Sequence, residues 1–131
     1  NIAIIDQARN ATGCAIVHSD DAVGIQHLNQ EAAKAMAAGN RAGYSISKAH
    51  AMKWITSNPA KAAGVLEHTG SIEAGKDADI VLWTHNPFSV YARAQQVLID
   101  GAVAYDMNDP KKQPVTDFDL GIINPQINRV Q

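Results

Sequence analysis

Apolar residues in the first half of the chain recur mainly at helical intervals. Ile4, Ile5, Ala8 and Ala11 fall on one face of a helix, so the pattern predicts an amphipathic helix at the start of the sequence. Residues 26–38 repeat this spacing and predict a second helix, whose many alanines favour a close packing face.

Residues 14–17 form a short run in which every side chain is apolar. Such a run is typical of a strand buried on both faces, usually in a parallel sheet. One strand cannot form a sheet, so we expect its partners elsewhere.

Two polar residues after the second helix mark the expected starts of two more helices. Ser47 is expected to cap a third helix that continues to Ile55. Asn58 is expected to cap a short fourth helix with Pro59 at its first position and Gly64 after its end.

The second half has the pattern of a small sheet. Residues 79–83 predict a strand, and the apolar stretches 94–99 and 102–105 flank Asp100-Gly101. An Asp-Gly pair between two such stretches favours a hairpin with a type I′ turn. After Asp106 the pattern is lost, and we expect an extended tail.

Composition narrows the function classes. The chain has 131 residues, 46% of them apolar including 22 alanines, and a net charge of −2. This describes one globular domain or a piece of a larger one, and not a disordered chain. Basic residues are evenly spread, so we expect no nucleic-acid partner. No apolar run approaches the roughly 20 residues that span a bilayer, so we expect no membrane partner.

The start of the sequence limits what can be said about localisation. The first residue is Asn, no signal peptide is recognisable, and Cys14 has no second cysteine to pair with. We expect a longer natural protein that is soluble, with the cytoplasm and the periplasm or exterior left open.

The candidate chemistry lies where the predicted strand ends. His18, Ser19, Asp20 and Asp21 follow it directly, and catalytic groups gather at the carboxyl ends of parallel strands. A carboxylate there can bind a metal or act as a general base. The alternative is that Ser19, Asp20 or Asp21 only caps nearby backbone amides.

Two motifs resemble the C-terminal signature of the amidohydrolase superfamily, in particular its imidazolonepropionase-like and prolidase-like group. They are ITSNPAKAAG at residues 55–64 and GSIEAGKDADIV at residues 70–81. The hairpin sequence at 97–101 is similar to the closing strands of that family. His18-Ser19-Asp20 is similar to the end of its eighth barrel strand.

This resemblance implies an α/β fold: the C-terminal part of a (β/α)8 TIM barrel together with strands of a small composite β-sandwich. The implied divisions are barrel at residues 1–65, sandwich at 66–108 and an extended tail at 109–131.

The resemblance also implies a metal-dependent hydrolase that cleaves amide or cyclic-amide C–N bonds with metal-activated water. The cofactor in the complete protein would be a divalent metal, zinc. Asp20 matches the residue that touches the metal and takes a proton from the water. His18, Asp21 and Gln26 would contact the substrate.

The histidine ligands of that family are absent from these residues, and a catalytic zinc needs about three protein ligands. We therefore expect the chain alone to bind no metal and to be inactive. Its expected partners are the missing N-terminal barrel segment or a companion chain, a further copy in a homo-oligomer, and a small amide substrate. The alternatives are a non-catalytic α+β interaction subunit and one half of a split amidohydrolase.

Overall fold

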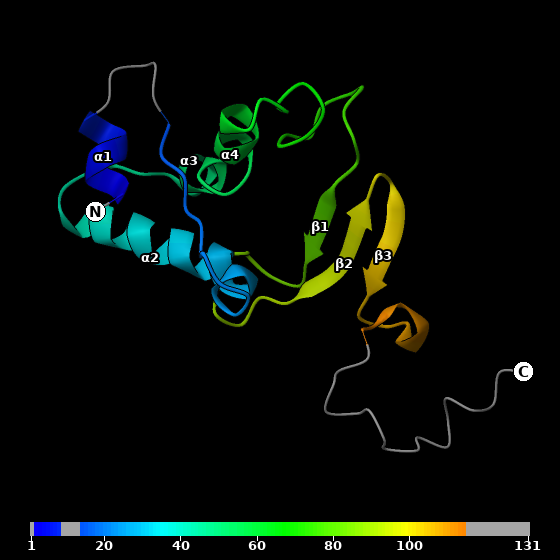
Figure 1. The fold of residues 1–131 in the computed structure, drawn as a ribbon. Helices are drawn as coiled ribbons and strands as arrows, with labels where there is room; N and C mark the ends of the chain where they lie inside the picture. The colour runs from blue at the N-terminus through cyan, green and yellow to red at the C-terminus, as the bar shows by residue number, and fades with distance from the viewer. Residues whose placement is uncertain (1, 9–13, 115–131) are drawn as a thin grey trace, which may run out of the picture.

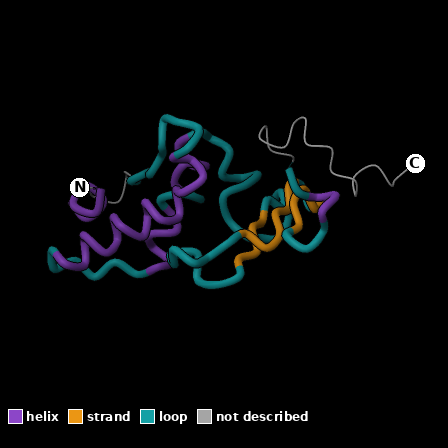
Figure 2. The backbone as a smooth tube through the Cα atoms, turned by 90° about the horizontal axis from the view of Figure 1, so that it is seen from below, coloured by secondary structure: helices purple, strands orange, loops and turns teal. Residues whose placement is uncertain are grey.

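The computed structural model describes residues 2–8 and 14–114 and combines a group of helices with a three-stranded sheet. Figures 1 and 2 show the helices on one side and the sheet on the other. The elements, in chain order, are α1 (Ile2–Ala8), η1 (Gly24–His27), α2 (Leu28–Arg41), α3 (Lys48–Lys53), α4 (Ser57–Ala62), β1 (Ile80–Trp83), β2 (Ala94–Ile99), β3 (Ala102–Asp106) and η2 (Pro110–Lys112). None of the described helices is long and apolar enough to cross a bilayer. Two parts of the sequence predictions, Ala11 in the first helix and the tail from residue 115, lie outside the described residues.

The hydrophobic core lies among the helices and is built largely from small side chains. Its members are Ala3, Ala15, Ala32, Ile46, Ala51 and Trp54. A Cβ added at Gly39 would lie 2.6 Å from both Ala3 Cβ and Ile46 Cδ1. Only glycine therefore allows α1 to approach α2 so closely. The predicted packing role of the alanine-rich helix is confirmed, because Ala32 is fully buried.

The predicted first helix is present as α1, but the core contact is made by Ala3. Ile4 and Ile5 are 45% and 54% exposed, whereas Ala3 is fully buried. The helix turns Ala3 toward the narrow gap at Gly39. Asp6 lies within hydrogen-bond distance of His50 Nε2 on α3 and of Trp54 Nε1 just after it.

The helix starts show one correct prediction and one error. The Ser47 hydroxyl accepts a hydrogen bond from the His50 amide at 3.1 Å, which confirms the cap of α3. Helix α4 begins at Ser57, so Asn58 lies inside its first turn and is not its cap. Its side-chain amide instead donates to the Ala15 carbonyl at 2.7 Å. Gly64 follows the helix with φ +75°, as expected for a helix end.

The segment at residues 14–17, predicted as a strand, has no strand partner among the described residues. Its partners were expected elsewhere, so the strand stays a prediction. The Val17 amide donates to the Trp54 carbonyl at 3.0 Å. The segment is therefore held by the α3–α4 corner, which lies beside it in Figure 1, and not by a sheet.

The sheet follows the prediction closely. Its order is β1-β2-β3, and both pairs are antiparallel, with Ile80 opposite Leu98 and Val97 opposite Tyr105. Asp100 and Gly101 have φ values of 52° and 77°, which a type I′ turn requires. The strands contain no buried residue.

One buried polar contact joins the helices to the loop before β2. Asn29 on α2 is 8% exposed, and its side-chain amide donates to the Pro87 carbonyl at 2.6 Å. This hydrogen bond fixes the loop between β1 and β2 against α2.

Candidate active site

Asp20 is an exposed residue of the turn that follows residues 14–17. Its φ is 58°, in the left-handed region that residues other than glycine rarely adopt. Its side chain is 92% exposed, and His18 Nδ1 lies 3.5 Å from Asp20 Oδ1. An ion pair this exposed contributes little stability. The carboxylate is therefore open to solvent or to another molecule.

Asp21 closes the same turn by capping backbone amides. Its Oδ1 accepts hydrogen bonds from the amides of Val23 at 2.8 Å and Gly24 at 2.6 Å. The Ser19 hydroxyl donates to the Asp21 carbonyl at 2.9 Å. The capping alternative is thus realised for Ser19 and Asp21, but none of these hydrogen bonds involves the side chain of Asp20.

Gln26 lies in η1, immediately after this turn. Its side chain is exposed and donates to the Ala22 carbonyl at 3.3 Å. The structure therefore places four exposed side chains within one short stretch of chain, those of His18, Asp20, Asp21 and Gln26. Their roles toward a substrate stay predictions.

A second group of polar residues lies at the contact between α1 and α3, and the sequence did not reveal it. The Asp6 side chain is only 9% exposed and lies 2.7 Å from His50 Nε2. It also accepts a hydrogen bond from Trp54 Nε1 at 3.1 Å, and the His50 and Trp54 rings meet edge to face at 5.9 Å. The spacing of His50 and Trp54, one helical turn apart, was the available signal, but nothing local paired them with Asp6.

The described residues do not supply a zinc site. Among residues 2–8 and 14–114, no three His, Cys, Asp or Glu side chains come close enough to hold a metal ion. A catalytic zinc needs about three protein ligands. The described residues therefore do not form a metal centre by themselves.

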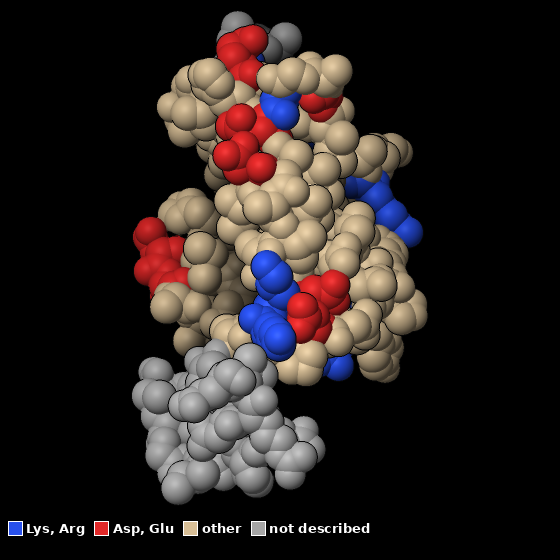
Figure 3. All heavy atoms as spheres, turned by 90° about the vertical axis from the view of Figure 1, so that its right-hand side faces the viewer, with Lys and Arg blue, Asp and Glu red and all other residues tan. Residues whose placement is uncertain are grey.

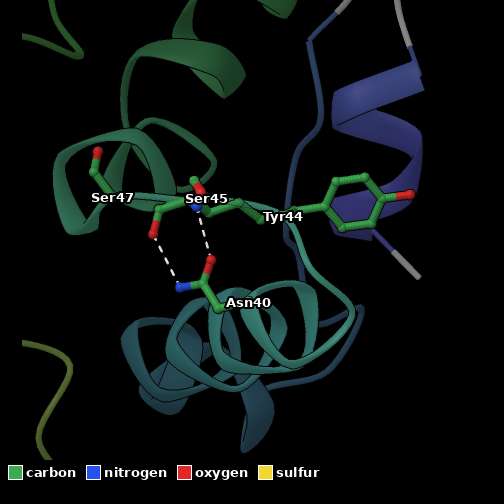
Figure 4. A pocket seen from close by; sticks show the side chains of 5 residues that line it. Asn40, Tyr44, Ser45 and Ser47 are labelled. Atoms are coloured by element: carbon green, nitrogen blue, oxygen red, sulfur yellow. Dashed lines mark hydrogen bonds between the residues drawn. The ribbon is translucent and has the colours of Figure 1, made fainter.

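A shallow surface hollow lies beside the end of α2. It is lined by Asn40, Tyr44 and Ser45 with Ile46 and Ser47 (Figure 4). The Asn40 side chain is already used there, since it accepts from the Ile46 amide at 2.7 Å and donates to its carbonyl at 3.1 Å. On the face drawn in Figure 3, acidic and basic side chains form small separate groups.

Comparison with known proteins identifies the class. The model of the amidohydrolase family matches residues 6–111, and the chain therefore belongs to this family. The matched stretch includes Asp20, the α3–α4 corner and the whole sheet.

Individual relatives agree with that assignment. The chain is 36% identical over 90 residues to "Amidohydrolase tasK" of Hapsidospora irregularis and 43% identical over 71 residues to "Urease subunit alpha" of Clostridium perfringens. The crystal structure of an amidohydrolase from Thermotoga maritima MSB8 superposes with a TM-score of 0.61 at 32% identity, over 71% of this chain.

The chain spans only a small part of each of these proteins. It covers 9% of the tasK protein, 12% of the urease subunit and 23% of the Thermotoga chain. The match to the tasK protein takes in 69% of this chain and the match to the urease subunit 50%.

Proposed function

We propose that this chain is the C-terminal portion of a metal-dependent hydrolase of amide or cyclic-amide C–N bonds. The observation that supports this most is an exposed aspartate, Asp20, in a left-handed turn within the stretch that matches the amidohydrolase family. Strained backbone at a solvent-facing polar residue is common at functional sites. Asp20 is thus the candidate catalytic residue.

The proposed role of Asp20 is proton transfer. A carboxylate within hydrogen-bond reach of the attacking water can accept its proton and return it to the leaving nitrogen as the C–N bond breaks. His18, Asp21 and Gln26 would contact the substrate. The proposed cofactor is zinc, for which Asp20 would be one ligand. The remaining ligands would come from elsewhere in the complete protein or from a companion chain.

The proposed architecture follows from the same family membership. Residues 1–65 would complete a (β/α)8 barrel, residues 66–108 would belong to a composite β-sandwich, and residues 109–131 would form the tail. Two further proposals are that the substrate is a small molecule such as an amide, a cyclic amide, a dipeptide or urea, and that its subgroup is imidazolonepropionase-like or prolidase-like.

Apolar side chains left open to solvent favour a partner for this chain. Ile4 and Ile5 on α1, and Val81 and Leu82 on β1, are between 41% and 54% exposed. Exposed apolar surface promotes association. A split amidohydrolase or a homo-oligomer is therefore the second candidate arrangement, and light scattering together with copurification would distinguish it from an isolated monomer.

The decisive experiment compares two aspartates in left-handed turns. In the complete protein supplied with zinc, Asp20→Asn should lower kcat for the best amide substrate by about 10²- to 10⁴-fold, because the general base is lost. Asp100→Asn, in the hairpin turn, should leave kcat unchanged. Full activity of Asp20→Asn would exclude the proposed mechanism.

A further inference from the structure

We infer that Asn58 is a positioning residue for Asp20, acting through the segment at residues 14–17. This inference deepens the proposed function and rests on it, because it assumes that the location of Asp20 matters for catalysis. Asn58 makes no recorded contact with Asp20. Its effect would pass along the backbone that leads into the turn.

Three hydrogen bonds attach this segment to the α3–α4 corner, the weakest of them from Cys14 Sγ to the Asn58 carbonyl at 3.8 Å. Asn58 Nδ2 donates to the Ala15 carbonyl at 2.7 Å, across 43 residues of sequence. Two residues further along, the Val17 amide donates to the Trp54 carbonyl at 3.0 Å. Trp54 is fully buried and Ala15 is 5% exposed, so the latter two attachments rest on the rigid part of the helical core.

Two of these attachments depend on a side chain, and only the one from Asn58 is supplied by a side chain of the α3–α4 corner. Asn58 lies in the first turn of α4, yet its amide group makes no cap there and is directed at Ala15. A leucine of similar size would fill the space but could not donate a hydrogen bond. The Ala15 carbonyl would then be left without this partner in a largely buried setting, which is costly.

The other side of Asp20 is restrained as well. Asp21 accepts hydrogen bonds from Val23 and Gly24, and this closes the turn immediately after Asp20. Asp20 therefore stands between a segment held by Asn58 and a turn held by Asp21. Releasing the segment would let the carboxylate move relative to its substrate. Small displacements of a reacting group lower the rate of the chemical step.

The test uses Asn58→Leu in the complete protein, with Asn29→Leu as a matched control. Asn29 also donates its side-chain amide to a distant carbonyl, that of Pro87 at 2.6 Å, but this carbonyl belongs to the loop between β1 and β2 and not to the segment before Asp20. Hydrogen exchange by mass spectrometry would follow peptides covering residues 14–20 and 94–106. The kinetics would separate kcat from KM.

The expected result is local. Asn58→Leu should raise the hydrogen-exchange rate at residues 14–18 by roughly three- to tenfold, because one hydrogen bond that holds the segment is lost. It should lower kcat on the order of 10- to 100-fold with KM nearly unchanged. Asn29→Leu should leave exchange at residues 14–18 and kcat unchanged. If Asn58→Leu does not fold, Asn58→Asp removes the same donor at the same size and decides the question.

Three outcomes would overturn the inference. They are unchanged exchange at residues 14–18, a loosened segment with full kcat, and an equal loss of kcat in Asn29→Leu. Failure of the proposed function would look different, because it would appear as full activity in Asp20→Asn whatever the exchange data show. That result would also remove Asn58 from catalysis, leaving it only a structural contact.

Discussion

Two turns in this protein place an aspartate in the left-handed region, and they are held in different ways. Asp20 has φ 58° and Asp100 has φ 52°. Both side chains are short and polar, which makes this conformation tolerable outside glycine. What differs is where the structural support for each turn comes from.

The turn at Asp100 is set by the hairpin that contains it, with added contacts to the residues just before β1. It connects two paired strands, and Gly101 takes the next left-handed position. The Asp100 amide donates to Asp79 Oδ1 at 3.0 Å, and the Gly101 amide donates to the Ala78 carbonyl at 3.2 Å. A two-residue hairpin turn explains this conformation completely.

The turn at Asp20 has no paired strands beside it among the described residues. The segment before it is attached to Asn58 and Trp54, far away in the sequence. Its conformation is not demanded by a hairpin, which agrees with the proposed functional role of Asp20. The difference teaches that the same backbone geometry can be reached with and without paired strands.

The largest expected effect comes from removing the core residue that supports the Asp20 segment. Trp54→Ala should lower the free energy of unfolding by about 3–5 kcal/mol, because a fully buried aromatic side chain is lost. The Asp6 carboxylate would also lose its indole donor. Urea denaturation measures the loss, and exchange at residues 14–18 should rise with it.

The other tryptophan provides the control for this change. Trp83 lies on β1 and is only half-buried. Trp83→Ala should cost about 1–2 kcal/mol, since much less apolar surface leaves water there. An equal or larger loss in Trp83→Ala would show that the sheet, and not the helical core, dominates the stability.

A glycine-to-alanine substitution in each of the two turns should have a smaller effect on stability, for a different reason in each. A Cβ at Gly24 would lie 2.6 Å from Asp21 Oδ2, so Gly24→Ala should displace the capping carboxylate and cost about 1 kcal/mol. Gly101→Ala should cost about 1–2 kcal/mol for a different reason, namely its φ of +77°. Chemical denaturation would measure both variants.

A double-mutant cycle separates these two causes. In an Asp21→Ala background the cap is already absent, so Gly24→Ala should then cost almost nothing, whereas Gly101→Ala should keep its full cost. Additive costs for Gly24→Ala and Asp21→Ala would contradict the proposed clash.

The sequence predicted features with local signals better than features that depend on residues far apart in the chain. The hairpin and the Ser47 cap were predictable because their signals lie within a few residues of one another. The capping role of Asn58 was wrong, since the Asn58 amide instead donates to a carbonyl 43 residues away. The Asp6–His50–Trp54 cluster was missed because its members also lie far apart in the sequence. For the candidate site, the sequence indicated Asp20 and the capping residues Ser19 and Asp21, but not Asn58.

The smallest expected effect is a dependence of the hairpin on pH. The Gln96 side chain donates to Asp106 at 2.6 Å and the Asn108 amide donates at 2.8 Å, and together they hold the pKa of the Asp106 carboxyl below its usual range. A carboxylate whose pKa is lower in the folded state stabilises the fold above its unfolded pKa, which is about 3.9 for aspartate. This stabilisation is lost as the pH falls through the folded pKa. Hydrogen exchange at residues 94–106 should therefore increase as the pH falls below about 4, after correction for intrinsic rates.

Gln96→Leu removes the larger cause of the lowered Asp106 pKa. It should flatten that pH dependence without changing exchange at residues 14–18. An unchanged pH dependence in Gln96→Leu would mean that the Asn108 amide alone sets the Asp106 pKa.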